Sequence, residues 1–317
     1  MNNHNLIIVT PVYEDVEASS KLFQELAKSF DKGVFIVAVD DGSVKQPLDL
    51  TTIEAAGLNG VVIKLKRNVG HQRAISIGLG YASEHMDKGQ IVVTMDSDGE
   101  DTPESIKELI RPLEDEHIDV VVAQRKSRVE SLKFKAFYII YKFIFHLLSG
   151  KKISFGNFMA FKHQSVKRAV SMNELGIHVA ATILSSKLRI ALLPLDRGPR
   201  YAGQSKMNFV GLVLHGFKGL MIFAEDVLVR VGIASALVAA LALLGSLMAI
   251  VLKLSGFATP GWFSVALGIL LLVFLQTGTM TLMMLMLTGV VKGNNIYPFD
   301  YHTFIDEVLH AKRIDGA

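Results

Sequence analysis

The sequence contains no cysteine and a single tryptophan, Trp262. Without cysteine, a disulfide framework and a thiolate metal site are both excluded, and the composition fits a reducing compartment. The first five residues contain no lysine or arginine, and the apolar run Leu6–Val9 is far shorter than the core of a signal peptide. We therefore expect the N-terminal domain to stay in the cytoplasm.

Two common nucleotide-binding motifs are also missing. No GxxxxGK[ST] occurs, which excludes a P-loop, and no GxGxxG follows the first expected strand, which excludes the dinucleotide-binding fingerprint. The net charge of +3 is too small to imply a nucleic-acid partner. We expect no nucleic acid among the partners.

Two long segments lack charge almost completely, Val231–Leu252 and Trp262–Val291. About 20 such residues span a hydrocarbon core of roughly 30 Å, so the segments predict two transmembrane helices, at about 231–253 and 262–291, joined by a Gly/Pro turn. Arg230 and Lys292 flank the pair, and the positive-inside rule puts both flanks in the cytoplasm. The predicted location is the inner (cytoplasmic) membrane, as a multi-pass protein. The alternative is a pair of buried core helices.

Small residues recur within these spans. They suit close helix contact, either inside the hairpin or between protomers of a homo-oligomer. They are Gly232, Ala236, Ala240, Gly245, Gly268 and Gly278.

Short apolar runs alternate with helical periodicity over the first 125 residues. This alternation predicts a doubly wound α/β sheet, whose ligands bind beyond the carboxyl ends of the strands. Pro11 is expected to end the first strand. The expected strands are Leu6–Val9, Val34–Val39, Val61–Leu65, Ile91–Met95 and Val120–Ala123, and the expected helices include Glu14–Phe30 and His71–Met86.

The stretch after Ile91–Met95 carries two carboxylates, Asp96 and Asp98, followed by Gly99. Residues i and i+2 of a strand point to one face, so both carboxylates can converge on a hard cation such as Mg²⁺ or Mn²⁺. The alternative is a surface turn, since Asp and Gly are common turn residues.

Two more strands end in polar clusters, Asp40-Asp41 and Arg67-Asn68. The second cluster leads into an expected helix N-terminus at His71, where free N–H groups favour an anion. Three polar clusters at three strand ends predict one site, which reads as a nucleotide-diphosphate site with a metal.

Two further segments mix apolar or aromatic residues with basic ones, 131–149 and 205–229. Basic amphipathic helices of this kind are typical of a membrane surface. For the first, packing on the domain core is the alternative.

Five blocks occur in the order typical of one family: Thr10-Pro11-Val12-Tyr13-Glu14, Val39-Asp40-Asp41-Gly42-Ser43, the run Arg67–Ala74, Met95–Asp98 with Thr102-Pro103-Glu104, and Arg200–Lys206, which reads RYAGQSK. Together they resemble glycosyltransferase family 2. The last block is similar to the RxxGxSK block of its polyprenyl-phosphate branch, the dolichol-phosphate mannose synthase-like enzymes. The resemblance covers about residues 5 to 225.

The resemblance implies a glycosyltransferase-A (Rossmann-like) catalytic domain followed by the transmembrane hairpin. We expect residues 1–204 to be the cytoplasmic catalytic domain, 205–229 a juxtamembrane helix and 230–292 the two spans. Residues 293–317 do not match the relatives, and we expect of them nothing beyond a cytoplasmic tail. The implied chemistry is inverting transfer of a sugar, from UDP in preference to GDP, to an undecaprenyl-type phosphate, for modification of cell-envelope glycans.

The resemblance also implies roles for single residues. Glu100 stands where many relatives carry glutamine, and Asn157 stands where many carry an aspartate considered as a base, so base catalysis from that position is in doubt. A phosphate monoester is already charged and needs no base. The implied nucleotide-binding residues are Pro11, Tyr13, Glu14, Asp40, Asp41, Asn68, Arg73, Asp96 and Ser97; the metal ligands are Asp96, Asp98 and Glu100; the lipid-phosphate ligands are Arg125, Arg128, Arg200, Ser205 and Lys206; and the catalytic set is Asp96, Asp98, Arg125, Arg200 and Lys206.

Three other functions are compatible with parts of the sequence. A polysaccharide synthase of the same family is disfavoured because its QxxRW motif is absent, Trp262 lying in the second span. A non-catalytic membrane protein with a nucleotide-sensing domain is disfavoured because the two spans contain no buried charge. An inactive scaffold is disfavoured by the intact Asp96 and Asp98.

Overall fold

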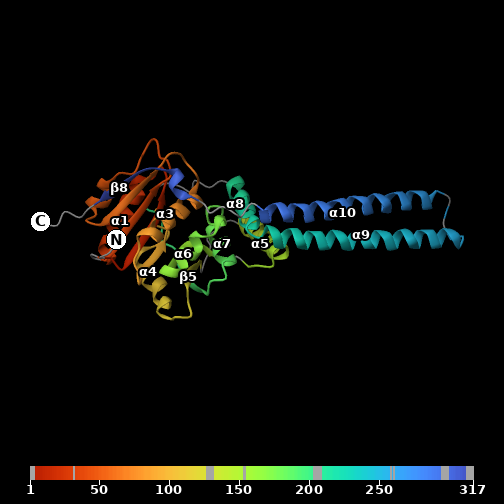
Figure 1. Ribbon diagram of the computed structural model, residues 1–317, viewed down its shortest axis with the longest axis horizontal. Coiled ribbons are helices and arrows are strands. Elements are labelled where there is room, and N and C mark those ends of the chain that lie inside the picture. The colour runs from red at the N-terminus through yellow and green to blue at the C-terminus, as the bar shows by residue number, and fades with distance from the viewer. Residues whose placement is uncertain are drawn as a thin grey trace. The chain divides into compact units, whose positions relative to one another are not determined.

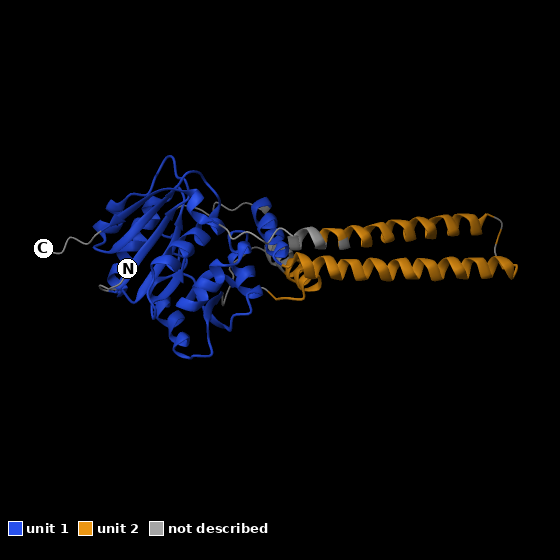
Figure 2. Ribbon diagram, in the orientation of Figure 1, with its two compact units in different colours: residues 1–138, 153–222, 298–317 blue, residues 139–152, 223–297 orange. Residues whose placement is uncertain are grey.

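The computed structural model describes residues 4–30, 33–125, 132–152, 155–202, 209–257, 259, 261–293 and 300–311. The chain divides into two compact units (Figure 2). Unit 1 contains residues 1–138, 153–222 and 298–317, and unit 2 contains residues 139–152 and 223–297. The second unit is thus inserted into the first, and the chain returns to unit 1 after it.

Unit 1 is built on one eight-stranded mixed sheet of order β7-β5-β6-β4-β1-β2-β3-β8. The central strands β4, β1, β2 and β3 are parallel, so their carboxyl ends lie at one edge of the sheet. Strand β6 is antiparallel to both β4 and β5. The strands are β1 (Leu6–Val12), β2 (Val34–Asp40), β3 (Asn59–Leu65), β4 (Ile91–Thr94), β5 (Val120–Arg125), β6 (Phe155–Lys162), β7 (Ile190–Leu195) and β8 (Ile305–Ala311).

Helices cover both faces of this sheet (Figure 1). Alternate residues of β1 enter two separate cores, Ile7 and Val9 on one face and Leu6 and Ile8 on the other. The first core is closed by α3 (His71–His85), α6 (His163–Val170) and α7 (Val179–Ser185); the second by α1 (Val16–Phe30), α2 (Leu50–Ala55) and α4 (Pro103–Ile110). Strands buried on both faces explain the continuous apolar runs of the sequence.

The expectation that Pro11 ends the first strand is wrong, because β1 runs on to Val12. Neighbouring residues of a strand direct their backbone groups to opposite sides, and the Val12 carbonyl accepts from the Asp41 N–H on the β2 side at 2.8 Å. Pro11 therefore faces β4, whose pairing with β1 already ends at Val9 and Thr94. Pro11 has no N–H to donate, but β4 offers no partner for a backbone hydrogen bond at this position.

The description of residues 293–317 as nothing more than a tail is also wrong. Strand β8 forms one edge of the eight-stranded sheet, antiparallel to β3 from Gly60–Ala311 to Leu65–Ile305. Just before it, the 3-10 helix η4 (Tyr301–Phe304) buries Tyr301. The adjacent pairs Asp306-Glu307 and Val308-Leu309 break the apolar/polar alternation that marks a half-buried strand, so the sequence gives no clear strand signal for β8.

Unit 2 consists mainly of α9 (Ala224–Leu254) and α10 (Trp262–Gly293), which run side by side (Figure 1). Ala224–Leu254 and Trp262–Met284 are each long and apolar enough to cross a membrane. Gly245 packs against α10, since a Cβ there would lie 3.2 Å from the side chain of Leu270. Gly268 and Gly278 have open space at this position. Homo-oligomer formation through these helices stays a prediction.

The C-terminal half of α5 (Leu132–Ser149) belongs to the same unit. The rings of Phe145 and Phe223 meet edge to face at 5.8 Å, and Arg230 Nη1 donates to the Leu147 carbonyl at 3.4 Å. A cation at a helix C-terminus also opposes the negative end of the helix dipole. These contacts attach the amphipathic helix to the base of α9.

Residue His178 caps the N-terminus of α7 and stacks on His215 of α8 (Phe209–Met221), with ring centroids 4.2 Å apart. Its Nδ1 accepts from the Ala181 N–H at 3.2 Å, so the cap requires an unprotonated nitrogen. Burial, followed by the charge of His215, lowers the pKa of His178 from 6.5 to about 3.

This lowered pKa predicts acid sensitivity of folding. Between pH 6.5 and about 3 the unfolded chain binds a proton at this residue that the folded chain does not. The free energy of unfolding should therefore fall with falling pH, by up to about 1.4 kcal/mol per pH unit for this group. In His178→Asn, which keeps a capping oxygen, denaturant unfolding should show a shallower fall from pH 7 to 5. The exposed His117→Asn should keep the wild-type slope; an equal change in both variants would contradict the assignment.

The Tyr301 ring sets a second prediction. A Cβ at Gly80 of α3 would lie 2.7 Å from a carbon of this buried ring. Gly80→Ala should therefore lower the free energy of unfolding by about 1–3 kcal/mol, as overpacking does. Combined with Tyr301→Leu, its cost should shrink. Additive costs in this double-variant cycle would show that the two residues do not meet.

Candidate active site

The candidate site begins where β4 ends. The Met95 N–H still donates to the Val9 carbonyl of β1 at 3.1 Å, and Asp96 is the first residue beyond the ladder. The following loop closes on itself: the Asp96 N–H donates to Asp101 Oδ2 at 3.2 Å, and the Glu100 N–H donates to Asp98 Oδ1 at 3.0 Å. Asp96, Asp98 and Glu100 are therefore held by backbone geometry at the carboxyl edge of the sheet.

Two arginines from the loop after β7 lie against these carboxylates. Arg200 donates through Nη2 to Asp98 Oδ2 and through Nε to Glu100 Oε1, both at 2.8 Å. Arg197 pairs with the other oxygen of Glu100 and lies 3.8 Å from Asp101 Oδ1. Both oxygens of Glu100 are thus engaged by guanidinium groups.

The backbones of the two loops are also joined. The Tyr201 N–H donates to the Asp98 carbonyl at 2.8 Å, and the Gly198 N–H donates to the Glu100 carbonyl at 3.0 Å. Gly99 adopts φ +87°, and a Cβ there would lie 2.5 Å from the ring of Tyr201. Two loops are therefore joined although about 100 residues separate them in sequence: the acidic loop after β4, which carries Asp96, Asp98 and Glu100, and the arginine loop after β7, which carries Arg197 and Arg200.

Burial raises the pKa of Asp98, and the charge of Asp96 raises it further, while Arg200, Arg197 and His71 oppose this shift. Burial also disfavours the charged form of Arg197 and so lowers the pKa of its guanidinium. A carboxylate whose pKa is raised by burial and by a neighbouring carboxylate marks a place where a cation would be stabilised.

Residue His71, the first of α3, joins the same cluster. Its Nε2 lies 3.1 Å from Asp96 Oδ1 and 3.2 Å from Asn157 Nδ2 of β6. Burial opposes its charged form, but the carboxylates of Asp96, Asp98 and Asp41 outweigh burial and raise the pKa of His71. The sequence predicted His71 only as the start of this helix. Its place directly after Gly70 in the Arg67–Ala74 block is the one signal that pointed to it.

Acidic residues at the ends of β1 and β2 hold a loop through their carboxylates. Glu14 accepts from the backbone N–H groups of Val44, Lys45 and Gln46 at 2.7–3.1 Å. Asp40 accepts from the N–H groups of Ser43 and Leu48 at 2.9 and 2.8 Å. In this structure, Glu14 and Asp40 shape the loop that follows β2.

Asp41 connects two strand ends. It accepts from the Val69 and Gly70 N–H groups at 2.7 and 3.0 Å, just before α3. Burial raises its pKa, and these two hydrogen bonds oppose the shift. Gly42 (φ +69°) lies so close to Arg67 and Asn68 that a Cβ would be 2.5 Å from the Arg67 carbonyl carbon. The loops after β2 and β3 are therefore interlocked.

The remaining predicted residues divide into three groups. Pro11 lies in β1, Tyr13 is exposed, and Ser97 is buried in the acidic loop. Asn68 belongs to the interlocked loops, while the Arg73 guanidinium lies over the Phe304 ring, 5.5 Å from its centroid. Arg125 ends β5, and its side chain falls outside the described residues, as do Arg128, Ser205 and Lys206.

The side chains present fit a divalent cation only in part. Carboxylate oxygens are the ligands that Mg²⁺ and Mn²⁺ prefer, and Asp96 and Asp98 come from one loop. Among the described residues, however, no three His, Cys, Asp or Glu side chains are grouped closely enough to hold a metal. Glu100 already pairs with both arginines. Asp96 and Asp98 would therefore be the chain's own ligands, with a diphosphate completing the shell.

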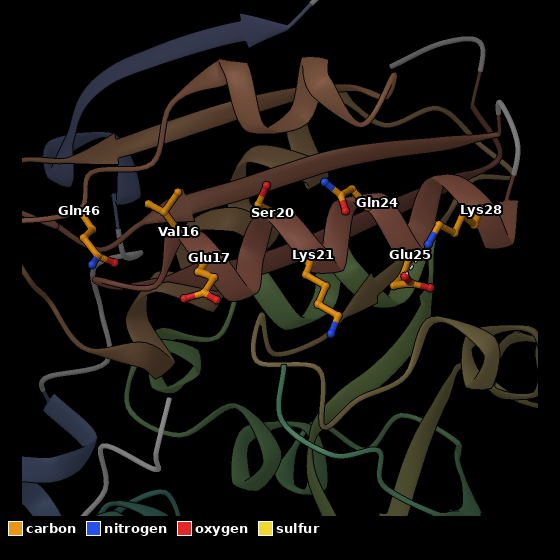
Figure 3. A pocket seen from close by; sticks show the side chains of 8 residues that line it. All are labelled: Val16, Glu17, Ser20, Lys21, Gln24, Glu25, Lys28 and Gln46. Atoms are coloured by element: carbon orange, nitrogen blue, oxygen red, sulfur yellow. Dashed lines mark hydrogen bonds and ion pairs between the residues drawn. The ribbon is translucent and has the colours of Figure 1, made fainter. Parts of the chain in front are cut away.

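A separate groove of about 740 Å³ runs along the outer face of α1. Glu17, Lys21 and Glu25 line it together with Gln46, as Figure 3 shows. None of the predicted site residues that the structure describes lines this groove. It has mixed charge and shows no convergence of acidic groups, so we do not assign the site to it.

Comparison with known proteins identifies the family. The glycosyl transferase family 2 model matches residues 7–171, more than half of the chain. The chain belongs to glycosyl transferase family 2. The family resemblance of the sequence blocks is confirmed.

Curated relatives include the undecaprenyl-phosphate 4-deoxy-4-formamido-L-arabinose transferases of Salmonella choleraesuis (strain SC-B67) and Edwardsiella ictaluri (strain 93-146). They are 26% and 28% identical over 213 and 214 residues. Each match covers 65% of this chain but only 63% and 64% of the relative. The matched region is therefore less than two thirds of those proteins.

Among solved structures, glucosyl-3-phosphoglycerate synthase from Mycobacterium tuberculosis, in complex with Mn²⁺, UDP-glucose and phosphoglyceric acid, aligns with a TM-score of 0.51. The identity is 16%, over 71% of this chain and 80% of that one. At this identity the likeness concerns the fold, and it confirms the glycosyltransferase-A fold expected from the sequence.

The contact between Gly99 and Tyr201 generates a prediction. Gly99→Ala would add a side chain at positive φ and against the ring, so the acidic loop should shift and transfer activity should fall at least about tenfold. The matched control is Gly57→Ala, also at positive φ (+69°) but with nothing within 4 Å of the new Cβ. It should lose only about 1–2 kcal/mol of unfolding free energy and keep its activity. Equal activity in the two variants would contradict the coupling of the two loops.

Proposed function

We propose that this glycosyltransferase moves a sugar from a nucleotide-diphosphate sugar, with UDP favoured, to an undecaprenyl-type polyprenyl phosphate. The observation that carries the proposal is the pairing of the acidic loop after β4 with the arginine loop after β7 in a chain that also has two membrane-capable helices. The names of the curated relatives support the same acceptor class.

The donor would bind at the carboxyl edge of the sheet. The first turn of α3 offers backbone N–H groups to the diphosphate, as helix N-termini do for anions. Asp96 and Asp98 would hold Mg²⁺ or Mn²⁺, which supplies Lewis-acid stabilisation of the departing nucleoside diphosphate. His71, held between Asp96 and Asn157, fixes the orientation of that loop at the start of α3.

The acceptor needs no base. A phosphate oxygen of the lipid attacks C1 of the sugar, the bond from C1 to the diphosphate oxygen breaks, and its electron pair leaves with the nucleoside diphosphate. Attack opposite the leaving group inverts the anomeric centre. Arg200, with Arg125, Arg128, Ser205 and Lys206, would neutralise the acceptor phosphate, since guanidinium groups bind phosphate in two-pronged fashion. The amide of Asn157 is consistent with chemistry that takes no proton from the nucleophile.

Two helices present apolar stripes that suit a lipid surface. The exposed stripe of α5 comprises Ile139, Ile140, Phe143, Ile144 and Leu147, and that of α8 comprises Val210, Leu214, Phe217 and Met221. Spacings of three and four residues put each stripe on one helix face. Because Arg230 and Phe223 attach α5 to the first residues of α9, its stripe would lie at headgroup level.

The topology supports one orientation. The chain enters unit 2 from unit 1 and returns to unit 1 afterwards, and two spans joined by a turn would have both flanks on one side of a membrane. With Arg230 and Lys292 as flanks, that side would be the cytoplasm of the inner membrane. The sugar would then be attached to its lipid carrier at the cytoplasmic leaflet.

The purified full-length protein in liposomes with undecaprenyl phosphate, Mn²⁺ and a panel of labelled nucleotide sugars tests the proposal. One donor should yield a lipid-phosphate sugar, and chelation by EDTA should stop its formation. Asp98→Asn should lose at least about 100-fold of the transfer rate, because the stabilisation of the leaving group is worth several kcal/mol.

The matched control is Asp87→Asn, an exposed aspartate of a loop outside the site, which should keep the wild-type rate. Full transfer by a folded Asp98→Asn would remove the metal assignment. Label on a growing glycan without a lipid-phosphate product would instead indicate a polysaccharide synthase.

A further inference from the structure

The C-terminal segment, residues 300–311, reaches the loop that precedes α3. The Lys66 N–H donates to the Phe304 carbonyl at 3.0 Å, and Lys66 Nζ donates to the Thr303 carbonyl at 3.1 Å. These contacts extend the β3–β8 pairing beyond Leu65. Lys66 is followed directly by the loop 67–70, whose other side is bound by Asp41. The loop is therefore fixed between Asp41 and the C-terminal segment.

The same segment also contacts α3 along one face. The Phe304 ring lies under the Arg73 guanidinium at 5.5 Å, Tyr301 packs on Gly80, and His302 Nε2 lies 3.2 Å from Glu84 Oε1. Residues 73, 80 and 84 are seven and four residues apart, which puts them on one side of a helix with 3.6 residues per turn. The segment thus lies along three turns of α3.

The Phe304 contact is the one nearest the candidate site. Arg73 is two residues from His71, whose imidazole meets Asp96. The Arg73 side chain also lies close to Gly176 of the 3-10 helix η2 (Asn173–Gly176), with Nε 3.5 Å from where a Cβ would stand. Arg73 is therefore held between η2 and the aromatic ring. By packing between these two groups, the Arg73 side chain holds the first turn of α3 in place.

We propose that Phe304 and the C-terminal segment position the donor-binding turn, residues 67–73, by clamping Arg73 and Lys66. The segment begins seven residues after the end of α10. The part of the chain that follows the two long helices would therefore set the geometry of the nucleotide site. Pre-organised binding groups cost less ordering on association, which strengthens donor affinity. The proposal rests on the proposed function, since it assumes that this turn receives the donor diphosphate.

Direct binding of UDP and UDP-sugars to the full-length protein in detergent with Mn²⁺, by calorimetry, tests the proposal. Phe304→Leu keeps apolar packing but removes the aromatic face, and should weaken donor binding roughly three- to tenfold, the value of a cation–π contact. The KM for polyprenyl phosphate should stay unchanged. Phe304→Tyr should restore donor affinity to within about twofold. His302→Gln, which alters the same segment three turns along α3, should bind as the wild type does.

Arg73→Gln provides a second route to the same result. It should weaken donor binding as Phe304→Leu does. The double variant should bind the donor no more weakly than either single variant, because both substitutions remove the same contact between Arg73 and Phe304. Wild-type affinity in a folded Phe304→Leu, or additive losses in the double variant, would overturn the inference. Failure of the wild-type protein to bind any nucleoside diphosphate would instead overturn the proposed function, so the two failures are distinguishable.

Discussion

The site depends on balancing negative charge at one edge of the sheet. The loop after β4 gathers Asp96, Asp98, Glu100 and Asp101 within six residues, and such a cluster is costly to bury without partners. The arginines of the loop after β7 provide these partners, as does His71 at the start of α3. Burial, followed by the charge of Asp96, still raises the pKa of Asp98, and a cation beside this carboxylate would favour its charged form.

This balance explains why distant parts of the chain must meet. The β4 and β7 loops are joined by two backbone hydrogen bonds as well as by ion pairs, so neither carries the site alone. The same loop that supplies Arg200 continues into the RxxGxSK block. Under the proposed function, a phosphate acceptor reaching this block would compete for guanidinium groups that already pair with the acidic loop. Donor and acceptor would then share their electrostatics through Arg200.

The insertion of unit 2 into unit 1 is the second organising feature. Because the chain returns after α10 to form β8, the catalytic sheet is complete only after the hairpin has been made. Strand β8 also covers the edge of β3, which would otherwise present unpaired backbone groups. In the sequence, the two long helices therefore lie between segments that form one sheet.

Local sequence determined much of this protein. The apolar runs Leu6–Val9 and Ile91–Met95 specified buried parallel strands, the charge-free segments specified long apolar helices, and the positions of Asp40, Asp41, Asp96 and Asp98 after strands specified one polar edge. These features follow from periodicity and from the parallel order of consecutive strands, both of which act over short distances. The family blocks added the reaction class.

Tertiary structure decided the rest. Only the folded chain brings Arg197 and Arg200 onto Asp98 and Glu100, turns Asp41 toward the N–H groups before α3, and lays Phe304 under Arg73. Pro11 is accepted in β1 because its neighbour β4 has already ended, and β8 is a strand because β3 offers it an edge. Each of these outcomes depends on a partner far away in sequence, whose position no local pattern of residues records.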